Sequence, residues 1–407
     1  MTSWVVALAA ALGAVLAATL GNGIQPVPRA AAAVPPSAAV LADLGRRAFF
    51  DPSLSASGRQ SCASCHSPAH AYGPPNALAV QLGGPELQTP GTRAVPSLRY
   101  LLKRTPVWSH TVVTNPLERL ADTDHVPSGG LAWDGRFNSV AEQVRAPLLA
   151  ANEMANGSVE AVAAKLARAA YAEDFRRAFG AEAMARPEVA VSALAAALQQ
   201  FLFDDPSLQP YSSRFDLWLD GRAQLTAREQ RGLRLFKDPA AGNCASCHLV
   251  ERGANGAHPL LTDFNFEALA VPRNGEIPAN RDPRYFDLGL CGPLREDAAR
   301  NNGKYCGLFK TPSLRNVATR GAFFHNGRFH RLEEALQFYV ERDTQPQKWY
   351  AAGRPDDLPL AFHGNVDRIH EPLTRKRGDP PVWNRRDVED VVAFLQTLTD
   401  ADAASVR

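Results

Sequence analysis

The pentapeptide CASCH occurs twice, at residues 62–66 and 244–248, and the fold can be worked out from these two segments. Cysteines three positions apart lie about one helical turn from each other, so both sulfurs can bond the vinyl groups of one haem. The histidine that follows then faces the iron as its proximal ligand. The sequence therefore predicts two covalently attached c-type haems, held by Cys62, Cys65, His66, Cys244, Cys247 and His248.

A zinc site and a thiol redox pair are the other common uses of these residue types. Zinc requires Cys₂His₂ or Cys₄ sets whose halves lie close in sequence, whereas these two pairs are far apart and each has its own histidine. A redox C-x-x-C usually sits beside a βαβ pattern, and the sequence shows none. Haem attachment is the preferred interpretation.

The sequence around the motifs is repeated as well. Ahead of them the chain reads LGRRAFFDP at 44–52 and RGLRLFKDP at 231–239. Behind them it reads VPSLRY at 95–100 and TPSLRN at 311–316, then WDGRFNSVAEQVRAP at 133–147 and HNGRFHRLEEALQFY at 325–339. Three blocks in the same order predict two related domains, each wrapping one haem.

Composition sets the outer limits. A chain of 407 residues with 45% hydrophobic residues can bury a substantial core, and its length suggests two or three domains. The formal net charge of +2 leaves no basic surplus of the kind that neutralises phosphates, so nucleic acid is not expected as a partner.

The N-terminal segment predicts export. An uncharged apolar run from Trp4 to Leu20 precedes a stretch of small residues and prolines, which is typical of a signal peptide over 1–36. No Lys or Arg precedes the run, so an uncleaved N-terminal anchor is the alternative. Both interpretations place the rest of the chain in the periplasm. In that oxidising compartment Cys291 and Cys306 are expected to form a disulfide, with two free buried thiols as the alternative.

Helical patterns dominate the secondary structure. The segment at 226–236 opens with Thr226 and Glu229 in capping-box spacing, and the segments at 159–179 and 384–398 place apolar residues at helical intervals. Alternating strand patterns are scarce. The sequence predicts an all-α protein of two tandem cytochrome c-type domains, at 37–222 and 223–407, with the boundary near Leu219 to Thr226.

The two copies of the third block end differently, in Pro147 and in Tyr339. If the copies occupy equivalent places, each of these residues faces the distal side of its own haem. Proline has no side-chain donor, so the first iron would be five-coordinate and open, whereas the oxygen of Tyr339 could close the second. The second domain contains no methionine, the usual ligand, because the chain has only Met1, Met154 and Met184.

Other assignments for the second haem stay open at this point. Tyr339 shares a helical face with Leu332 and Leu336 and can equally belong to the core. The histidines that compete as ligands are His258, His325, His330, His363 and His370.

These segments together resemble the bacterial diheme cytochrome c peroxidase and MauG superfamily. The resemblance rests on both CASCH motifs, LGRRAFFDP, PSLR, WDGR, the NEM of 152–154 and FKTPSLRNVATRGAFFHNGRF at 309–329, and it covers nearly all of the chain after residue 40. Ordinary members carry methionine where this chain has Tyr339, so the chain is most similar to the MauG-like, tyrosine-ligated branch.

The resemblance implies roles for four further residues. Gln143, Pro147 and Glu153 would lie on the distal side of a peroxidatic first haem, and Trp133 would lie between the haems as an electron relay. Glu153 would move a proton between the oxygens of hydrogen peroxide as general acid and base, while Gln143 would orient the peroxide. The alternatives are a solvated helix face for Glu153 and Gln143 and a core aromatic for Trp133.

Two departures from the family are expected. His70 follows the proximal His66 too closely to act as a distal ligand that must leave, so the first haem should react without prior reduction. The family commonly binds calcium between its haem domains, but Ala94, Arg320 and Ala322 stand at the corresponding positions. A fixed guanidinium could take over the electrostatic role of the cation, so calcium is doubtful.

Three functions are consistent with the sequence. The first is a periplasmic diheme peroxidase that reduces hydrogen peroxide with electrons from a small electron-transfer protein, a cytochrome c or a cupredoxin. The second is a MauG-like, peroxide-dependent oxidase of a partner protein's side chain. The third, from another class, is a non-catalytic electron carrier, which would have no use for an open iron.

Overall fold

The computed structural model describes residues 35–110 and 127–403, and from Pro36 onward these residues belong to one unit. The predicted signal peptide at 1–36 lies almost wholly outside the described residues. Within the described ranges, no helix is long and apolar enough to cross a membrane.

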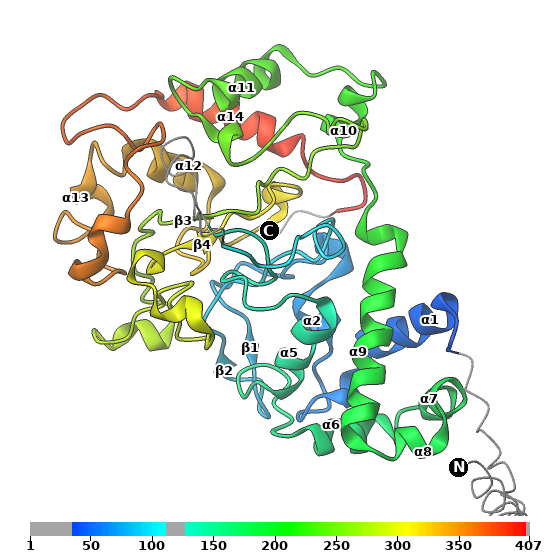
Figure 1. The fold of residues 1–407 in the computed structure, drawn as a ribbon. Helices are drawn as coiled ribbons and strands as arrows, with labels where there is room; N and C mark the ends of the chain where they lie inside the picture. The colour runs from blue at the N-terminus through cyan, green and yellow to red at the C-terminus, as the bar shows by residue number, and fades with distance from the viewer. Residues whose placement is uncertain (1–34, 111–126, 404–407) are drawn as a thin grey trace, which may run out of the picture. The chain divides into compact units, whose positions relative to one another are not determined.

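Helices supply most of the regular structure (Figure 1). The longer helices are α1 (Ala38–Phe49), α6 (Val159–Leu166), α7 (Ala172–Phe179), α9 (Pro187–Asp204), α11 (Ala227–Lys237), α12 (Leu332–Glu341) and α14 (Arg385–Gln396). The shorter ones are α2 (Cys62–Cys65), α4 (Val140–Gln143), α5 (Arg145–Leu149), α8 (Ala181–Met184), α10 (Arg214–Leu219) and α13 (Pro346–Trp349). Single 3₁₀ turns are η1 (Pro52–Leu54), η2 (Pro68–His70), η3 (Pro206–Leu208), η4 (Cys244–Ser246), η5 (Pro278–Arg281), η6 (Ala298–Asn301), η7 (Gly303–Tyr305), η8 (Val317–Thr319) and η9 (Leu360–Asn365).

The prediction of an all-α protein needs a small correction. Two antiparallel strand pairs are present, β1 (Leu82–Gly83) with β2 (Thr89–Pro90) and β3 (Phe266–Glu267) with β4 (Phe309–Lys310). Each strand has two residues, so they tie loops together rather than form a layer. The protein is helix-rich with little sheet.

Helices are present in most of the segments where local sequence patterns predicted them. The side chain of Thr226 caps α11 by accepting from the amide of Glu229, and the carboxylate of Glu229 accepts from the amide of Thr226. The predicted helical pattern at 159–179 is interrupted between α6 and α7. There Tyr171 turns into the core, where its hydroxyl donates to Asp51 over 2.8 Å.

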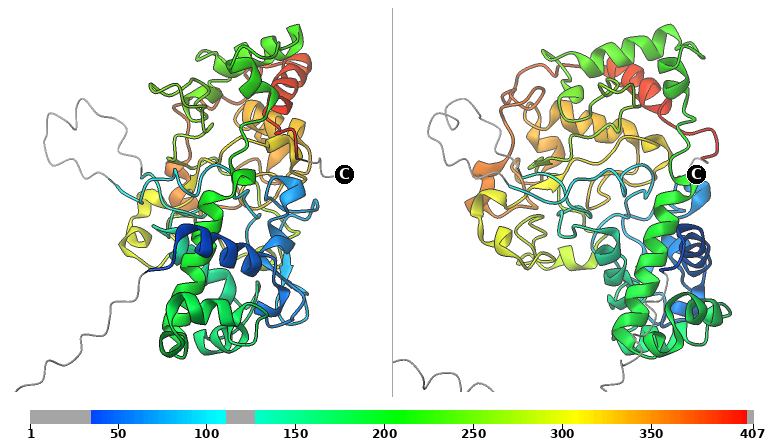
Figure 2. Two further views of the ribbon diagram at one scale, coloured as in Figure 1. Left: turned by 90° about the vertical axis from the view of Figure 1, so that its right-hand side faces the viewer. Right: turned by 45° about the vertical axis from the view of Figure 1, so that its right-hand side comes forward.

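A repeated glycine allows two helix pairs to cross closely. Gly45 of α1 faces the backbone of Ala197 on α9, and Gly232 of α11 faces the backbone of Asp390 on α14; a Cβ atom at either glycine would overlap a carbonyl oxygen. Figures 1 and 2 show α1 beside α9, and α11 beside α14. The glycine shared by the first sequence blocks therefore has the same packing role in both copies.

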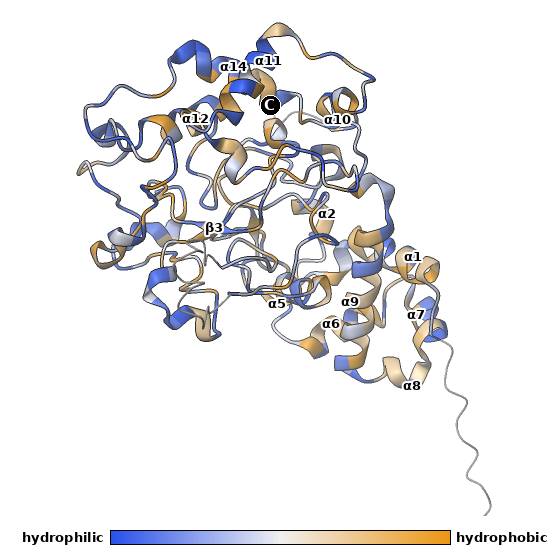
Figure 3. Cartoon of the chain, turned by 45° about the horizontal axis from the view of Figure 1, so that its top comes forward, coloured by the Kyte–Doolittle hydropathy of each residue, from blue (hydrophilic) through white to orange (hydrophobic). Residues whose placement is uncertain are grey.

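The buried apolar residues form two large clusters. One contains residues between Leu44 and Leu208, and the other contains residues between Phe215 and Leu398. The predicted stripe on α14 is buried in the second cluster, and Figure 3 shows hydrophilic and hydrophobic stretches along this helix. The domain limits at 222 and 223 stay a prediction, which this separation of the clusters favours.

The GRF blocks have the same backbone conformation. Leu131 donates its amide to Phe137 over 2.7 Å, and Phe323 donates to Phe329 over 2.9 Å. Gly135 and Gly327 take positive φ angles of 63° and 61° inside these turns, which glycine adopts without strain. We name residues 131–137 the first turn and residues 323–329 the second turn.

Candidate functional site

One cavity of about 490 Å³ is lined by every site residue expected from the sequence. Its walls include both CASCH motifs and the residues Trp133, Gln143, Pro147, Glu153 and Tyr339. Residues more than 250 positions apart in the chain thus meet around a single space.

The first motif forms α2, whose last turn leads into His66. The amide of His66 donates to the carbonyl of Cys62 over 2.9 Å, so the predicted helical turn is present. The ring Nδ1 of His66 lies 3.1 Å from the carbonyl oxygen of Tyr72. Burial lowers the pKa of His66 to about 4, against the opposing effect of backbone hydrogen bonds to Tyr72 and Pro96. The imidazole is therefore neutral, with Nδ1 oriented toward the backbone.

The second motif repeats this arrangement in η4. The amide of His248 donates to Cys244 over 2.8 Å, and its Nδ1 lies 3.0 Å from the carbonyl oxygen of Leu261. Burial lowers the pKa of His248 as well. A neutral histidine whose Nδ1 is held by a carbonyl presents its Nε2 to a metal, which is how proximal histidines are oriented.

The cysteines fit covalent haem attachment better than thiol chemistry. Burial raises the pKa of Cys62 to about 12 and that of Cys65 to about 11, and it raises the pKa of Cys244 and Cys247 to about 12. Redox-active C-x-x-C pairs require the opposite, a lowered thiol pKa. Two pairs of half-buried cysteines, each followed by an oriented neutral histidine on an apolar cavity, match the needs of two c-type haems.

Glu153 lies near the first motif. Its side chain is exposed to the cavity that it lines. Protein atoms nevertheless surround the carboxyl group, and this burial raises its pKa, whereas the charge of Arg136 lowers it. The charge of Glu153 in turn contributes to the raised pKa of both Cys62 and Cys65, after burial. A raised pKa makes this carboxylate a stronger proton acceptor than an ordinary one.

Gln143 and Pro147 reach the same cavity from two short helices. Gln143 ends α4, and Pro147 lies in the first turn of α5. The carbonyl of Pro147 accepts from the amide of Met154 over 3.0 Å, which ties the proline to the segment that carries Glu153.

Tyr339 lies near the second motif. It lines the cavity from α12 and packs against Phe324, with ring centroids 5.6 Å apart. Burial raises the pKa of the Tyr339 hydroxyl far above its ordinary value, and the nearby Cys244, Cys247 and Glu267 raise it further. The phenol is thus neutral in the protein alone, and coordination to a metal cation would be needed to release its proton.

Three of the competing histidines lie outside the lining of the cavity. His258 lies 3.0 Å from Asp220, His330 lies 3.0 Å from Glu276, and His363 lies 2.9 Å from the carbonyl of Leu358. His325 and His370 line the cavity and stay competitors of Tyr339, with Nδ1 of His370 3.1 Å from Asp367.

His325 occupies the position in the second turn that Trp133 occupies in the first. Its ring stacks on Phe309, with centroids 3.5 Å apart, and its buried Nε2 has no hydrogen-bond partner among the described residues. The charges that act on its pKa, after burial, are those of Asp287 and Arg93, not those of the second motif. This surrounding favours Tyr339 over His325 near the second haem.

Each turn accepts a backbone hydrogen bond from a segment of the other repeat, and the sequence did not predict either bond. The amide of Ala94 donates to His325 over 2.7 Å, and the amide of Lys310 donates to Trp133 over 2.9 Å. The indole Nε1 of Trp133 also donates to the carbonyl of Ala94 over 2.8 Å. Trp133 is therefore held at the junction of the two repeats.

A buried ion cluster beside this junction was also missed. Arg93 donates to both carboxylate oxygens of Asp287 over 2.7 Å and to Asp134 over 2.8 Å. The part of this cluster that the sequence motifs contain is Asp134, the aspartate of WDGR, which follows Trp133. Partners so distant in the chain cannot be paired from one sequence.

Arg320 stands at one of the positions that correspond to the calcium site of the family. Its guanidinium donates to the carbonyls of Val95 and Ala322, over 3.0 and 3.1 Å. The guanidinium therefore joins the start of the VPSLRY block at 95–100 to the residue before the second turn.

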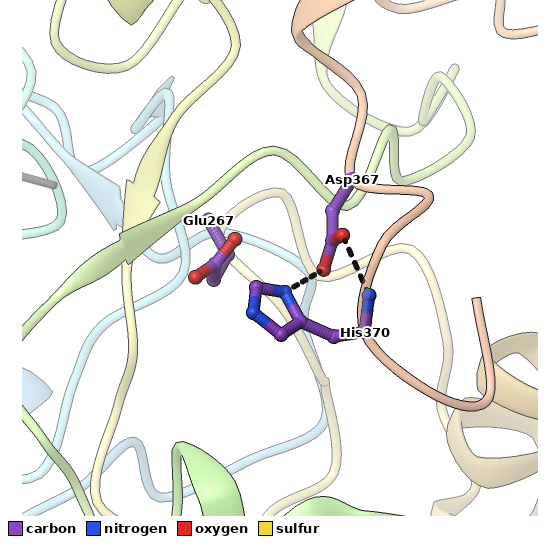
Figure 4. A group of neighbouring side chains, drawn as sticks. All are labelled: Glu267, Asp367 and His370. Atoms are coloured by element: carbon purple, nitrogen blue, oxygen red, sulfur yellow. Dashed lines mark hydrogen bonds and ion pairs between the residues drawn. The ribbon is translucent and has the colours of Figure 1, made fainter. Parts of the chain in front are cut away.

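A separate group of possible metal ligands borders the second motif. Glu267, Asp367 and His370 offer ligand atoms within 4.8 Å of one another, and Figure 4 shows their side chains converging. Burial raises the pKa of Cys247, and the charges of Asp263, Glu267 and Asp367 add to the rise. The group thus contributes negative charge beside the second haem site.

Comparisons with known proteins agree with this geometry. The family model for di-haem cytochrome c peroxidase matches residues 39–224. The methylamine utilization protein MauG of Paracoccus denitrificans is 31% identical over 90% of both chains. This chain belongs to the diheme cytochrome c peroxidase and MauG family. Its members are oxidoreductases with two c-type haems, which confirms the predicted cofactors and enzyme class and disfavours the non-catalytic carrier.

Two further relatives of the family support the assignment. The cytochrome c551 peroxidase of Nitrosomonas europaea is 29% identical, over 96% of this chain and 90% of its own. The crystal structure of the diheme peroxidase BthA from Burkholderia thailandensis superposes with a TM-score of 0.80 at 42% identity, covering 89% of this chain and 86% of BthA. The chain therefore has the diheme peroxidase fold.

Proposed function

We propose that the chain reduces hydrogen peroxide at the first haem, in the periplasm, with electrons that arrive through the second. The observation that carries this proposal is the contrast between the two ends of the cavity. Pro147 offers no donor beside the first motif, whereas Tyr339 presents a phenol near the second. An open site and a closed site suit substrate binding and electron transfer, respectively.

A haem bound through Cys62, Cys65 and His66 would supply the iron redox chemistry that cleaves peroxide. Glu153, with its raised pKa, accepts a proton from one peroxide oxygen and returns it to the other. Gln143 orients the peroxide by hydrogen bonding, and Pro147 leaves room beside it. Two electrons and two further protons then complete the reduction of one peroxide to two waters.

Trp133 is proposed as the electron relay. Its indole lines the cavity that both motifs line. Its Nε1 donates to Ala94 of the first repeat, and its carbonyl accepts from the amide of Lys310 of the second repeat. A tightly held aromatic ring at the junction needs little rearrangement when an electron passes.

The electron source separates two enzyme candidates. A small electron-transfer protein, a cytochrome c or a cupredoxin, would serve a peroxidase. A protein substrate would serve a MauG-like oxidase, which Tyr339 favours because an anionic phenolate ligand lowers a haem potential relative to a methionine thioether. Such a haem is a poor collector of electrons from a high-potential carrier.

Mixing the oxidised diheme protein with hydrogen peroxide tests the common part of the proposal. We expect peroxide to react without prior reduction of either haem, as followed by stopped-flow absorbance. Adding a reduced cytochrome c should then give two molecules of cytochrome c oxidised per peroxide consumed. A protein that reacts only after reduction has a first haem that is closed, and the proposal fails.

A further inference from the structure

Arg320 carries a buried positive charge that the protein only partly satisfies. Its Nε and Nη1 donate to backbone carbonyls, but its Nη2 is buried and has no hydrogen-bond partner among the described residues. Within the same described ranges, no carboxylate forms an ion pair with it. By contrast, the buried Arg93 is paired with Asp134 and Asp287.

This guanidinium remains charged at neutral pH. Burial lowers the pKa of Arg320 only to about 10. An uncompensated buried cation costs several kcal/mol, so a protein retains one where an anion offsets it. An unsatisfied N–H beside such a charge adds to the cost.

The location of Arg320 indicates where that anion lies. Arg320 lines the cavity together with His66 and Trp133. It donates to the carbonyl of Val95, and in the same segment the amide of Leu98 donates to the carbonyl of Tyr72 over 3.2 Å, the oxygen that lies 3.1 Å from Nδ1 of His66. The Val95 carbonyl that it holds belongs to the residue before Pro96, whose backbone also acts on His66.

We propose that Arg320 is a carboxylate-binding residue whose Nη2 donates to a propionate of the first haem. A haem brings two carboxylates into this cavity, and the guanidinium forms strong charge-assisted hydrogen bonds to such groups. Arg320 thereby acts as a positioning residue that fixes the first haem against both repeats. The proposal rests on the two haems of the family and not on Tyr339 ligation or on peroxide turnover, so each can fail alone.

The same contact sets the redox equilibrium of the first haem. A cation beside a propionate offsets its negative charge and so favours the ferrous state over the ferric state. Without the cation the propionate also takes up a proton more readily, and the potential becomes dependent on pH.

Spectroelectrochemical titration of the diheme protein tests this inference. Arg320→Gln should shift the ferric to ferrous equilibrium of the first haem toward ferric at least tenfold, which lowers its midpoint by about 59 mV for one electron. The midpoint should also gain a slope between pH 5 and 8. Arg320→Lys keeps the charge and should retain most of the native potential.

A matched control separates this contact from general destabilisation. Arg295 is more buried than Arg320, at 2% exposure, but it is paired with Asp297 and does not line the cavity. Arg295→Gln should lower the melting temperature and leave the potential of the first haem unchanged. A native-like, pH-independent potential in Arg320→Gln would overturn the proposal.

A crystal structure of the haem-loaded native protein gives a second test, which holds if Arg320→Gln does not fold. We expect Nη2 of Arg320 to lie within hydrogen-bond distance of a propionate oxygen of the first haem. A structure in which Nη2 contacts only water or backbone would refute the assignment.

Discussion

The first and second turns have the same backbone but lead into different helices. After the first turn, α4 and α5 are short and separated at Val144, because Pro147 has no amide to bond the carbonyl of Gln143. After the second turn, α12 runs for ten residues and carries Tyr339 near its end. The shared backbone thus brings Pro147 and Tyr339 to equivalent positions, and the residue at that position decides whether a ligand atom is available to a haem iron.

The third position of each turn shows a second difference. Trp133 is satisfied by its hydrogen bond to Ala94, whereas His325 stacks on Phe309 and keeps a buried Nε2 without a partner in the described chain. Equivalent places in two repeats therefore hold one hydrogen-bonded aromatic ring, the proposed electron relay, and one ring that stacks on a neighbour. The repeats are alike in backbone and unlike in chemistry.

The strongest test of this contrast replaces Tyr339. Tyr339→Phe removes the only oxygen of the side chain, so the second haem should change from six-coordinate low-spin to five-coordinate high-spin while the first haem is unaffected. Tyr339→Met should restore six-coordination and raise the potential, because a thioether stabilises ferrous iron better than a phenolate does. Electron paramagnetic resonance distinguishes the spin states.

Tyr350 provides the matched control. It is buried in the second cluster and its hydroxyl donates to Ala270 over 2.7 Å, but it does not line the cavity. Tyr350→Phe should cost about 1 kcal/mol of stability and leave both spectra native. A persistent low-spin signal in Tyr339→Phe would make His325 or His370 the ligand to test next.

For the two enzyme candidates, Tyr339→Met should weaken oxidation of a protein substrate and preserve turnover with a reduced carrier.

Glu153 tests the other half of the contrast, the open site. Glu153→Gln should preserve both haems but slow the reaction with peroxide by about 10²-fold or more, because a positioned proton-transfer group is lost. Glu142→Gln is the control, since Glu142 lies outside the cavity and glutamine also completes the capping box of α4.

The pH dependence of the same rate has a defined sign. Burial raises the pKa of Glu153 above its model-peptide value of 4.5. Because the carboxylate form accepts the first proton, the rate constant should rise with pH through an inflection above 4.5 and should lose that inflection in Glu153→Gln. An unchanged rate in the variant would mean that Glu153 only lines the cavity.

Features that depend on neighbouring residues in the chain were predictable from sequence. Both CASCH turns, the Thr226 capping box and the Cys291–Cys306 disulfide are confirmed. The hydrogen bonds from Ala94 to His325 and from Lys310 to Trp133 were not predictable, because backbone groups of any residue can form them. The partners of Arg93 were missed because an ion pair across the fold leaves no spacing pattern.

The disulfide distinguishes the second repeat from the first, which has none among its described residues. It closes a loop with a sequence separation of 15 between Cys291 and Cys306. Replacing both cysteines with alanine should cost about 3 kcal/mol of stability in the chain-entropy model, as measured by denaturant unfolding. The haem attachment and the spectrum of the first haem should stay native, and a change in that spectrum would show that the loop shapes the shared cavity.

Treatment with a calcium chelator is expected to change the spectra and the stability least of all these tests, because Arg320 already joins the two repeats. The guanidinium occupies the carbonyls of Val95 and Ala322, which would otherwise be offered to a cation, and a divalent ion beside it would be repelled. Dialysis against a chelator should therefore leave the spectra of both haems and the melting temperature unchanged. Arg320→Ala frees both carbonyls, so added Ca²⁺ should raise the melting temperature of this variant by mass action while leaving the native protein unaffected. A native protein that loses its first-haem spectrum on chelation would show that a cation, and not the guanidinium, holds the repeats together.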